Sequence, residues 1–151
     1  MKTYTLEREQ VVNKPLWETF GFFSKPENLA RVTPPEMGFK ILSPLPIIMM
    51  AGVAIDYSIK ILGFKVHWRS WIGSYDPPCG FVDEQLKGPY RYWHHRHQFE
   101  KTEGGTRIYD HVTYLLPFGF LGRLAHPLFV RRKLKYIFDY RSAVIKEIFA
   151  R

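Results

Sequence analysis

The chain is poor in cysteine and has no long apolar run. Its 151 residues include a single cysteine, Cys79, which excludes an internal disulfide and is typical of a reducing compartment. Residues 1–20 carry charged and polar side chains throughout, so they lack the apolar core of a signal peptide. The longest apolar run, residues 44–55, is shorter than the roughly 20 residues of a membrane-spanning helix. We therefore expect a soluble, cytoplasmic protein.

Acidic residues are also scarce, since 14 of them oppose 22 lysines and arginines and leave a formal net charge of +8. This balance favours anionic partners such as acidic lipid surfaces, nucleic acids or anionic small molecules. The densest basic cluster lies in residues 131–135. Aromatic residues make up 17% of the chain, which suits a large core or a pocket and argues against disorder. No repeat or linker divides the sequence, so we expect a single domain over residues 1–151.

Motifs for nucleophilic catalysis and for phosphate binding are missing. The chain has no G-x-S-x-G sequence, and Cys79 lies in a predicted proline turn without an assigned partner. Gly104 and Gly105 fit a hairpin turn and lack the strand-to-helix context of a phosphate loop. We therefore expect neither a covalent nucleophile nor a cofactor.

Hydrophobic periodicity predicts a strand, two short helices, about six antiparallel strands and a long helix. The strands are expected at residues 4–12, 39–42, 53–62, 65–74, 81–87, 90–99 and 106–116, and the helices at 13–24, 26–31, 119–126 and 128–149. A run of hairpin-linked strands that ends in a helix favours an α+β arrangement. We expect a curved antiparallel sheet of about six to seven strands, wrapped on the long C-terminal helix.

The strand predicted at residues 90–99 carries the most distinctive chemistry. Successive strand side chains point to opposite faces. Five side chains therefore share one face, which the aromatic members mark as buried: Arg91, Trp93, His95, His97 and Phe99. Paired imidazoles on a buried face indicate a polar patch in the core or the floor of a pocket. We expect both histidines to face the C-terminal helix and His94 to face away from it.

Three interpretations of this histidine pair follow from its spacing. Two imidazoles at i, i+2 can meet one metal ion, with Asp110 or His111 as a third ligand from the next strand. They can instead be structural, hydrogen-bonded to Asp110, Gln85 or a tyrosine. An adjacent Asp110 can also hold the tautomer and raise the imidazole pKa, as a general base requires. We favour the structural interpretation and expect no metal.

Several segments carry a family resemblance: FVDEQ at residues 81–85, GPY at 88–90, WHHRHQF at 93–99, GGT at 104–106, DHVTYLLP at 110–117 and IFDYR at 137–141. With these segments and its order of elements, the chain resembles the SRPBCC superfamily. These helix-grip proteins include START domains, birch-pollen allergens and bacterial polyketide cyclase/dehydrase-like proteins. The resemblance implies a deep, mostly apolar cavity between the sheet and the C-terminal helix. It implies no catalytic residue, because the fold hosts carriers, receptors, chaperones and a few enzymes.

The expected function is binding of a hydrophobic or amphipathic small molecule, as a carrier or a sensor. The candidate cavity residues are Tyr57, Ile59, Trp68, Gln85, Trp93, His95, His97, Phe99, Asp110, Val112, Tyr114, Phe138 and Arg141. One alternative is a cyclase- or dehydratase-type enzyme that uses His95, His97 and Asp110 for acid–base chemistry.

A second alternative is a lipid carrier that acts at anionic membranes. Apolar residues 46–53 and basic residues 131–135 would then lie near one cavity mouth, unless the apolar loop packs over the protein's own core. Nucleic acid is a weaker partner, because alternation divides the basic and aromatic residues of 91–96 between two sheet faces.

Overall fold

The structure consists of seven strands, three α-helices and three short helical turns of other types. The strands are β1 (Tyr4–Val12), β2 (Lys40–Ile41), β3 (Ala54–Ile61), β4 (Phe64–Asp76), β5 (Gly80–Lys87), β6 (Tyr92–Thr102) and β7 (Gly105–Leu115). The helices are α1 (Leu16–Phe23), the 3-10 helices η1 (Pro26–Val32) and η2 (Pro35–Met37), α2 (Gly119–Ala125), the π-helix η3 (His126–Val130) and α3 (Arg131–Phe149). The predicted order of elements and the α+β class are confirmed.

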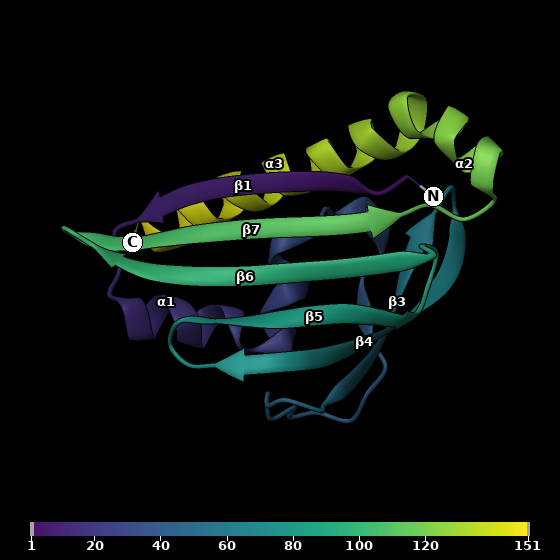
Figure 1. The fold of residues 1–151 in the computed structure, drawn as a ribbon. Coiled ribbons are helices and arrows are strands. Elements are labelled where there is room, and N and C mark those ends of the chain that lie inside the picture. The colour runs from purple at the N-terminus through teal and green to yellow at the C-terminus, as the bar shows by residue number, and fades with distance from the viewer. Residues whose placement is uncertain (1, 151) are drawn as a thin grey trace.

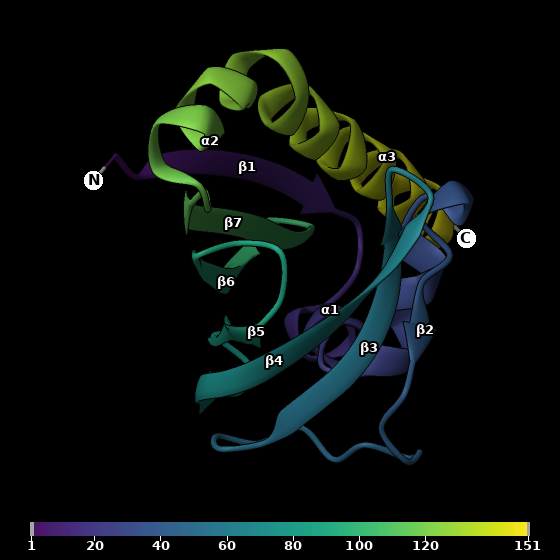
Figure 2. The same ribbon diagram turned by 90° about the vertical axis from the view of Figure 1, so that its right-hand side faces the viewer.

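The strands form one antiparallel sheet in the order β1-β7-β6-β5-β4-β3-β2. This computed structural model describes residues 2–150, apart from the side chains of Pro127 and Leu128, so both ends of the predicted 1–151 domain lie outside the described residues. Figure 2 shows the sheet curving from β1 and β7 round to β3 and β2, with α3 across its concave side. Figure 1 places α1 and α2 at opposite ends of the sheet.

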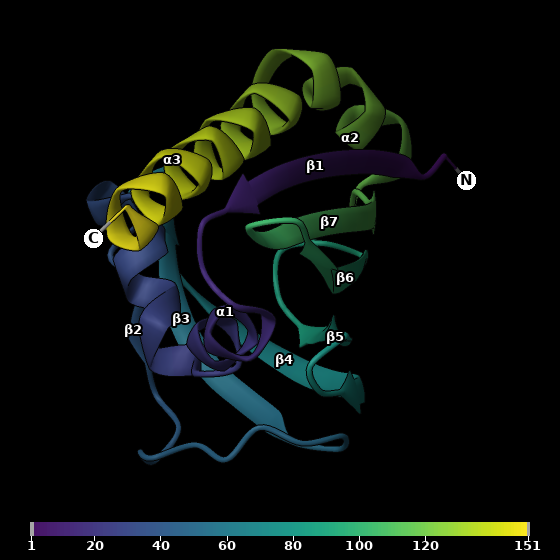
Figure 3. The ribbon, with the colours of Figure 1, turned by 90° about the vertical axis from the view of Figure 1, so that its left-hand side faces the viewer.

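Irregularities in β4 account for much of this curvature. Its pairing with β5 shifts register between Arg69 and Ser70 and again between Ile72 and Ser74. An extra residue on one strand bends it and increases its twist. Because β4 is 13 residues long and lies between β5 and β3, both neighbours follow its bend. The concave side that results encloses α1, as Figure 3 shows, and leaves room beneath α3.

Strand β6 begins two residues later than the sequence predicts. The side chain of Gln85 binds both backbone groups of Tyr90, donating from Nε2 to the Tyr90 oxygen at 2.6 Å and accepting from its N–H at 3.0 Å. Tyr90 therefore cannot join the ladder, and Arg91, expected on the buried face, is exposed. The alternation from Trp93 onward is as predicted, with alternate side chains buried as far as Phe99.

Helix α3 contacts the sheet through an apolar stripe. Its buried residues Leu134, Phe138, Ile145 and Phe149 recur at helical spacing. The first two belong to one hydrophobic cluster with Trp68, and the last two to a second cluster. The helix therefore spans two separate apolar clusters and leaves a stretch between them that is not packed by aliphatic side chains.

Removing the Ile145 side chain tests how strongly α3 depends on the second cluster. Ile145 is 2% exposed, so Ile145→Ala should lower the free energy of unfolding by about 2–5 kcal/mol through lost burial and a cavity. The matched control is Ile48→Ala, since Ile48 is 73% exposed, and its effect should stay within about 0.5 kcal/mol. Urea unfolding followed by circular dichroism measures both. Equal effects would contradict the assignment of Ile145 to the core.

Candidate ligand-binding cavity

A cavity of about 820 Å³ lies between the concave side of the sheet and α3. This volume falls in the range of small-molecule pockets, about 300–1,000 Å³. Most of its wall is apolar, with Phe23, Met37, Phe39, Ile55, Ile59, Trp68, Ile72, Trp93, Leu134 and Phe138 among the lining side chains. The wall therefore suits a molecule with a hydrophobic body.

A belt of polar side chains crosses this apolar wall. It consists of Tyr57 on β3, Ser70 on β4, Asp83 on β5, His95 and His97 on β6, and Arg141 on α3, all of which line the cavity. On β6 the belt follows Trp93, which belongs to the first hydrophobic cluster, and precedes Phe99, which belongs to the second. The belt thus fills the gap between the two clusters and forms a polar floor.

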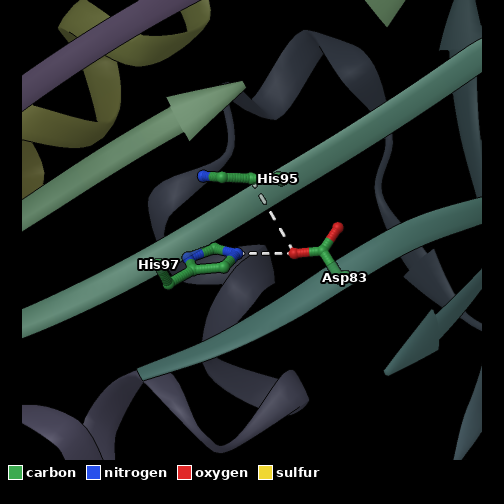
Figure 4. Close-up of side chains that lie close together, drawn as sticks. All are labelled: Asp83, His95 and His97. Atoms are coloured by element: carbon green, nitrogen blue, oxygen red, sulfur yellow. Dashed lines mark hydrogen bonds and ion pairs between the residues drawn. The ribbon is translucent and has the colours of Figure 1, made fainter. Parts of the chain in front are cut away.

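Two carboxylates and two imidazoles form the centre of the floor. The sheet register places Asp83 opposite His95 and Asp110 opposite His97, yet the short hydrogen bonds run diagonally. His95 Nε2 is 2.8 Å from Asp110 Oδ1, and His97 Nε2 is 2.5 Å from Asp83 Oδ2. The two rings stack with centroids 3.7 Å apart. Figure 4 shows Asp83 reaching toward both histidines from the neighbouring strand.

His95 is neutral at ordinary pH. Burial and the neighbouring His97 lower the pKa of His95 by more than Asp110 and Asp83 raise it. Asp110 raises the pKa of His95 as predicted, but desolvation of the charged ring outweighs the carboxylate, so the net pKa is lowered and not raised. A neutral His95 donates its Nε2–H to Asp110, which leaves Nδ1 with a lone pair.

Both carboxylates are ionised. Burial opposes the charged form of Asp110, but the hydrogen bond from His95 and the proximity of His97 and Arg141 lower its pKa to about 2. Burial also opposes the charge on Asp83, and there the hydrogen bond from His97 prevails and lowers the pKa. In contrast, burial raises the pKa of Tyr57, so that its hydroxyl stays protonated. The floor thus holds two negative charges and a tyrosine hydroxyl.

Arg141 and Trp68 carry donors that nothing in the described residues satisfies. Arg141 Nε and Trp68 Nε1 are both buried without a hydrogen-bond partner. Arg141 stacks over the ring of Phe138 at 5.1 Å and makes no ion pair within 4.0 Å in the described part of the chain. Buried donors normally have partners. Since both side chains line the cavity, an acceptor on a bound molecule would satisfy them.

One end of the cavity opens between the β3–β4 hairpin and the start of α3. Leu62 and Gly63 of the hairpin line this end together with Phe129 and Lys133. Figures 1 and 2 show the hairpin and α2 at the same end of the molecule. Several large apolar side chains are exposed there: Leu62, Phe64, Phe118, Phe120, Leu121, Leu124 and Phe129. We call this set the mouth patch.

Comparison with solved structures places this architecture among known folds. No protein-family model and no curated protein matches the sequence. The structure of StfQ, a di-domain ARO/CYC from the steffimycin biosynthetic pathway, aligns with a TM-score of 0.73 at 14% identity over 98% of this chain and 51% of that one. TTHA0849 from Thermus thermophilus aligns with a TM-score of 0.71 at 15% identity over 95% of each chain. Ara h 8.0201 aligns with a TM-score of 0.63 at 17% identity over 95% of this chain and 99% of that one.

The chain has the SRPBCC helix-grip fold. The open seven-stranded sheet, the short helices after β1 and the long α3 are the elements that the alignment shares over nearly the whole chain. At these identities the likeness shows the fold alone, so the function has to be argued from the cavity.

Eight of the thirteen residues expected at the helix-grip cavity line it. They are Tyr57, Ile59, Trp68, Trp93, His95, His97, Phe138 and Arg141. His95 faces α3 as expected, with its ring 5.7 Å from that of Phe138. The alternation of β3, β4 and β6 is what brings these side chains to one concave face.

The other five residues lie outside the cavity wall, each for a local reason. Gln85 is held by the Tyr90 backbone and does not contact the histidines. Phe99 packs against Phe20 and Phe81 in the second cluster. Asp110 and Val112 are buried on β7 but do not line the cavity, and Tyr114 hydrogen-bonds to His126 at 2.6 Å. The predicted contact of Asp110 with a histidine is nevertheless present.

Asp83, the carboxylate that faces the cavity, was not among the residues predicted from the sequence. Asp83 lies two residues after the buried Phe81, so strand alternation alone would have put it on the inner face. Tyr90 and Ser70 also line the cavity and were not identified. For Ser70 the same alternation, counted from Trp68, was the available signal.

Acid titration tests the ionised state of Asp110. Its pKa is about 2 in the folded protein and 3.8 in an open chain, so the unfolded chain binds the proton first and stability falls between about pH 4 and pH 2. In Asp110→Asn, the loss of free energy of unfolding over this pH range should be smaller by about 2 kcal/mol. Urea unfolding between pH 7 and pH 2 measures it, with Asp76→Asn at the exposed end of β4 as control. If the loss of stability between pH 4 and pH 2 is the same in Asp110→Asn as in the parent, other groups are responsible for it.

Proposed function

We propose that this chain is a single-domain carrier or sensor that binds a hydrophobic or amphipathic small molecule beneath α3. The observation that carries the proposal is the mostly apolar cavity of about 820 Å³ with a belt of polar side chains across its floor. Such a cavity buries the body of a ligand in apolar surroundings and orients it through a few polar groups. Proteins with this fold include one named as an ARO/CYC, which supports a small organic molecule as occupant.

The floor favours a ligand that carries an oxygen acceptor. Arg141 and Trp68 offer unsatisfied donors, and the protonated hydroxyl of Tyr57 lies 3.4 Å from Ser70 Oγ on the same floor. A guanidinium that makes no other ion pair binds carboxylates and carbonyl oxygens well, because its fork presents parallel N–H groups. We therefore infer that the ligand's polar end lies at Arg141 and that its body extends along the apolar wall.

A cyclase- or dehydratase-type reaction is the second candidate. His95 is neutral, lines the cavity and is held in one tautomer by Asp110, so its Nδ1 can accept a proton from a bound substrate. Loss of turnover in His95→Ala, with ligand binding retained, would distinguish this enzyme from a carrier. Full turnover in that variant would remove the catalytic role of His95.

Substituting Arg141 tests where the polar end binds. Native mass spectrometry of the purified protein first shows whether a small molecule is retained. Arg141→Gln should then weaken binding of the acidic probe dansyl-undecanoic acid about tenfold or more, because a charged hydrogen bond is lost. The neutral probe 1-aminoanthracene should bind as before.

The matched control is Arg96→Gln on the exposed side of β6, which should change neither probe. Equal weakening of both probes in Arg141→Gln would show a general loss of cavity shape. Failure of the parent protein to retain any molecule or bind either probe would contradict the carrier proposal itself.

We also propose that the carrier exchanges its ligand at anionic membranes through the mouth patch. Leu62 is 89% exposed, Phe120 64% and Phe129 67%, and exposed apolar side chains gathered at one end of a protein mark an interaction surface. Basic side chains surround them, and no acidic residue occurs between Asp110 and Asp139. This combination matches the apolar core and acidic headgroups of a lipid surface. No helix within residues 2–150 is long and apolar enough to cross the bilayer.

In this proposal a different apolar segment accompanies the basic cluster. Residues 46–53 precede β3, whereas the β3–β4 hairpin follows it, so the two lie at opposite ends of this strand. The basic cluster at the start of α3 lies at the hairpin end. Residues 46–53 and 131–135 therefore do not share one mouth, and α2 with the hairpin takes the place of the loop.

Vesicle flotation separates the two segments. The double variant Phe120→Asp, Leu121→Asp should weaken binding to vesicles of phosphatidylserine and phosphatidylcholine about tenfold or more, because two apolar side chains no longer enter the lipid. The matched double variant Ile48→Asp, Met50→Asp changes exposed apolar residues of the loop and should bind as the parent does. Binding that is equal on neutral vesicles, or is lost only in the loop variant, would contradict the proposed surface.

A further inference from the structure

Four nitrogen atoms of the histidine pair divide into two sets. His95 Nε2 and His97 Nδ1 face Asp110 Oδ1, at 2.8 and 3.5 Å. His95 Nδ1 and His97 Nε2 face Asp83 Oδ2 instead, at 3.8 and 2.5 Å. Asp83 lines the cavity and Asp110 does not, and Figure 4 shows Asp83 beside both rings. The rings thus present one nitrogen each to a buried carboxylate and one each to a carboxylate at the cavity.

This division is the arrangement that a metal-binding histidine pair requires. A ligating imidazole uses one nitrogen for the metal and donates its other N–H to a carboxylate or carbonyl. Asp110 can accept from both rings when the proton of His97 is on Nδ1 rather than on Nε2. With that tautomer, His95 Nδ1 and His97 Nε2 present lone pairs beside Asp83.

The charge of the cluster points to the same ligand. The cluster contains two acidic side chains, Asp83 and Asp110, and a single guanidinium, that of Arg141, lines the same floor. Acidic groups therefore outnumber fixed cationic groups there, and an uncompensated buried charge is costly. A cation between Asp83 and the two rings would compensate that charge.

We propose that Asp83 Oδ2, His95 Nδ1 and His97 Nε2 bind a divalent transition-metal ion of the zinc type at the cavity floor. The three atoms all lie within 4.8 Å of one another, and the ligands of a tetrahedral ion are about 3.3 Å apart. Asp83 has to move away from His97 Nε2 and the stacked rings have to turn for the ion to enter. Two nitrogens and one carboxylate oxygen are a donor set suited to zinc, cobalt or iron.

The position of the site gives the ion a free coordination place. All three ligating residues line the cavity, so the fourth position faces the bound molecule or water. The sequence analysis sought the third ligand on the strand after β6, whereas the structure supplies it from β5, the strand on the other side. The inference does not rest on the proposed carrier function, because it concerns the metal alone.

Metal titration of the chelator-treated protein tests the inference without any organic ligand. The parent should bind one Zn²⁺ per chain in competition with a chromophoric chelator, and Co²⁺ should give the visible absorption of a four- or five-coordinate ion. Asp83→Asn and His97→Gln should each weaken Zn²⁺ binding about 100-fold or more, and Asp110→Asn about 10–100-fold. His94→Gln lies on the same strand but faces away from the site, and it should bind as the parent does.

A measurement on the parent protein guards against variants that fail to fold. Nitrogen-15 spectra of the imidazoles should show His95 Nδ1 and His97 Nε2 shifting on addition of Zn²⁺, while the nitrogens of His94 stay in place. Unchanged Zn²⁺ affinity in Asp83→Asn, or Zn²⁺-induced shifts confined to other histidines, would overturn the inference. Absence of any Zn²⁺ binding by the parent would overturn it as well and would leave the carrier proposal standing.

Discussion

Asp83 and Asp110 are ionised carboxylates placed between two hydrophobic clusters, and their need for donors organises the concave side of the sheet. Each takes its donor from a histidine of β6 across a diagonal of the ladder. A buried charge without such partners would cost several kcal/mol. The histidines, in turn, occupy the space that aliphatic side chains would otherwise fill. The core is therefore divided in two, and the cavity keeps one polar place in an apolar wall.

Cavity size and cavity chemistry arise from different parts of the sequence. The irregular pairing of β4 with β5 bends the sheet and keeps α3 at a distance, which sets the volume. The polar belt depends only on which residues fall on the inner face of each strand. This separation explains how one fold can hold unrelated molecules, since side chains of the belt can change without altering the bend. The similarity to an ARO/CYC and to Ara h 8.0201 is therefore a similarity of the backbone fold.

Strand alternation predicted much of this site, because it needs only local sequence. It placed Trp93, His95 and His97 on one buried face, and the structure agrees. Asp83 was missed because the third partner of the histidines was sought on β7, whereas β5 lies on the other side of β6. Alternation counted from Phe81 nevertheless places Asp83 on the inner face of β5. The same alternation places Gln85 on the inner face, but its side chain hydrogen-bonds to the backbone of Tyr90 in the following loop. Hydrophobic periodicity does not reveal such a contact. The sequence alone could not show that the apolar side chains of α2 are exposed and not part of the hydrophobic core.

Helix α3 and the sheet are joined in a different way from the strands. Within residues 2–150, no backbone-to-backbone hydrogen bond links α3 to a strand, and polar contacts such as Arg8 with Asp139 lie at its margin. Lifting the helix would leave the ladders of the sheet intact and would break mainly apolar contacts. Such contacts weaken on cooling, whereas the ladders do not depend on them. Cooling therefore weakens the attachment of α3 more than it weakens the sheet.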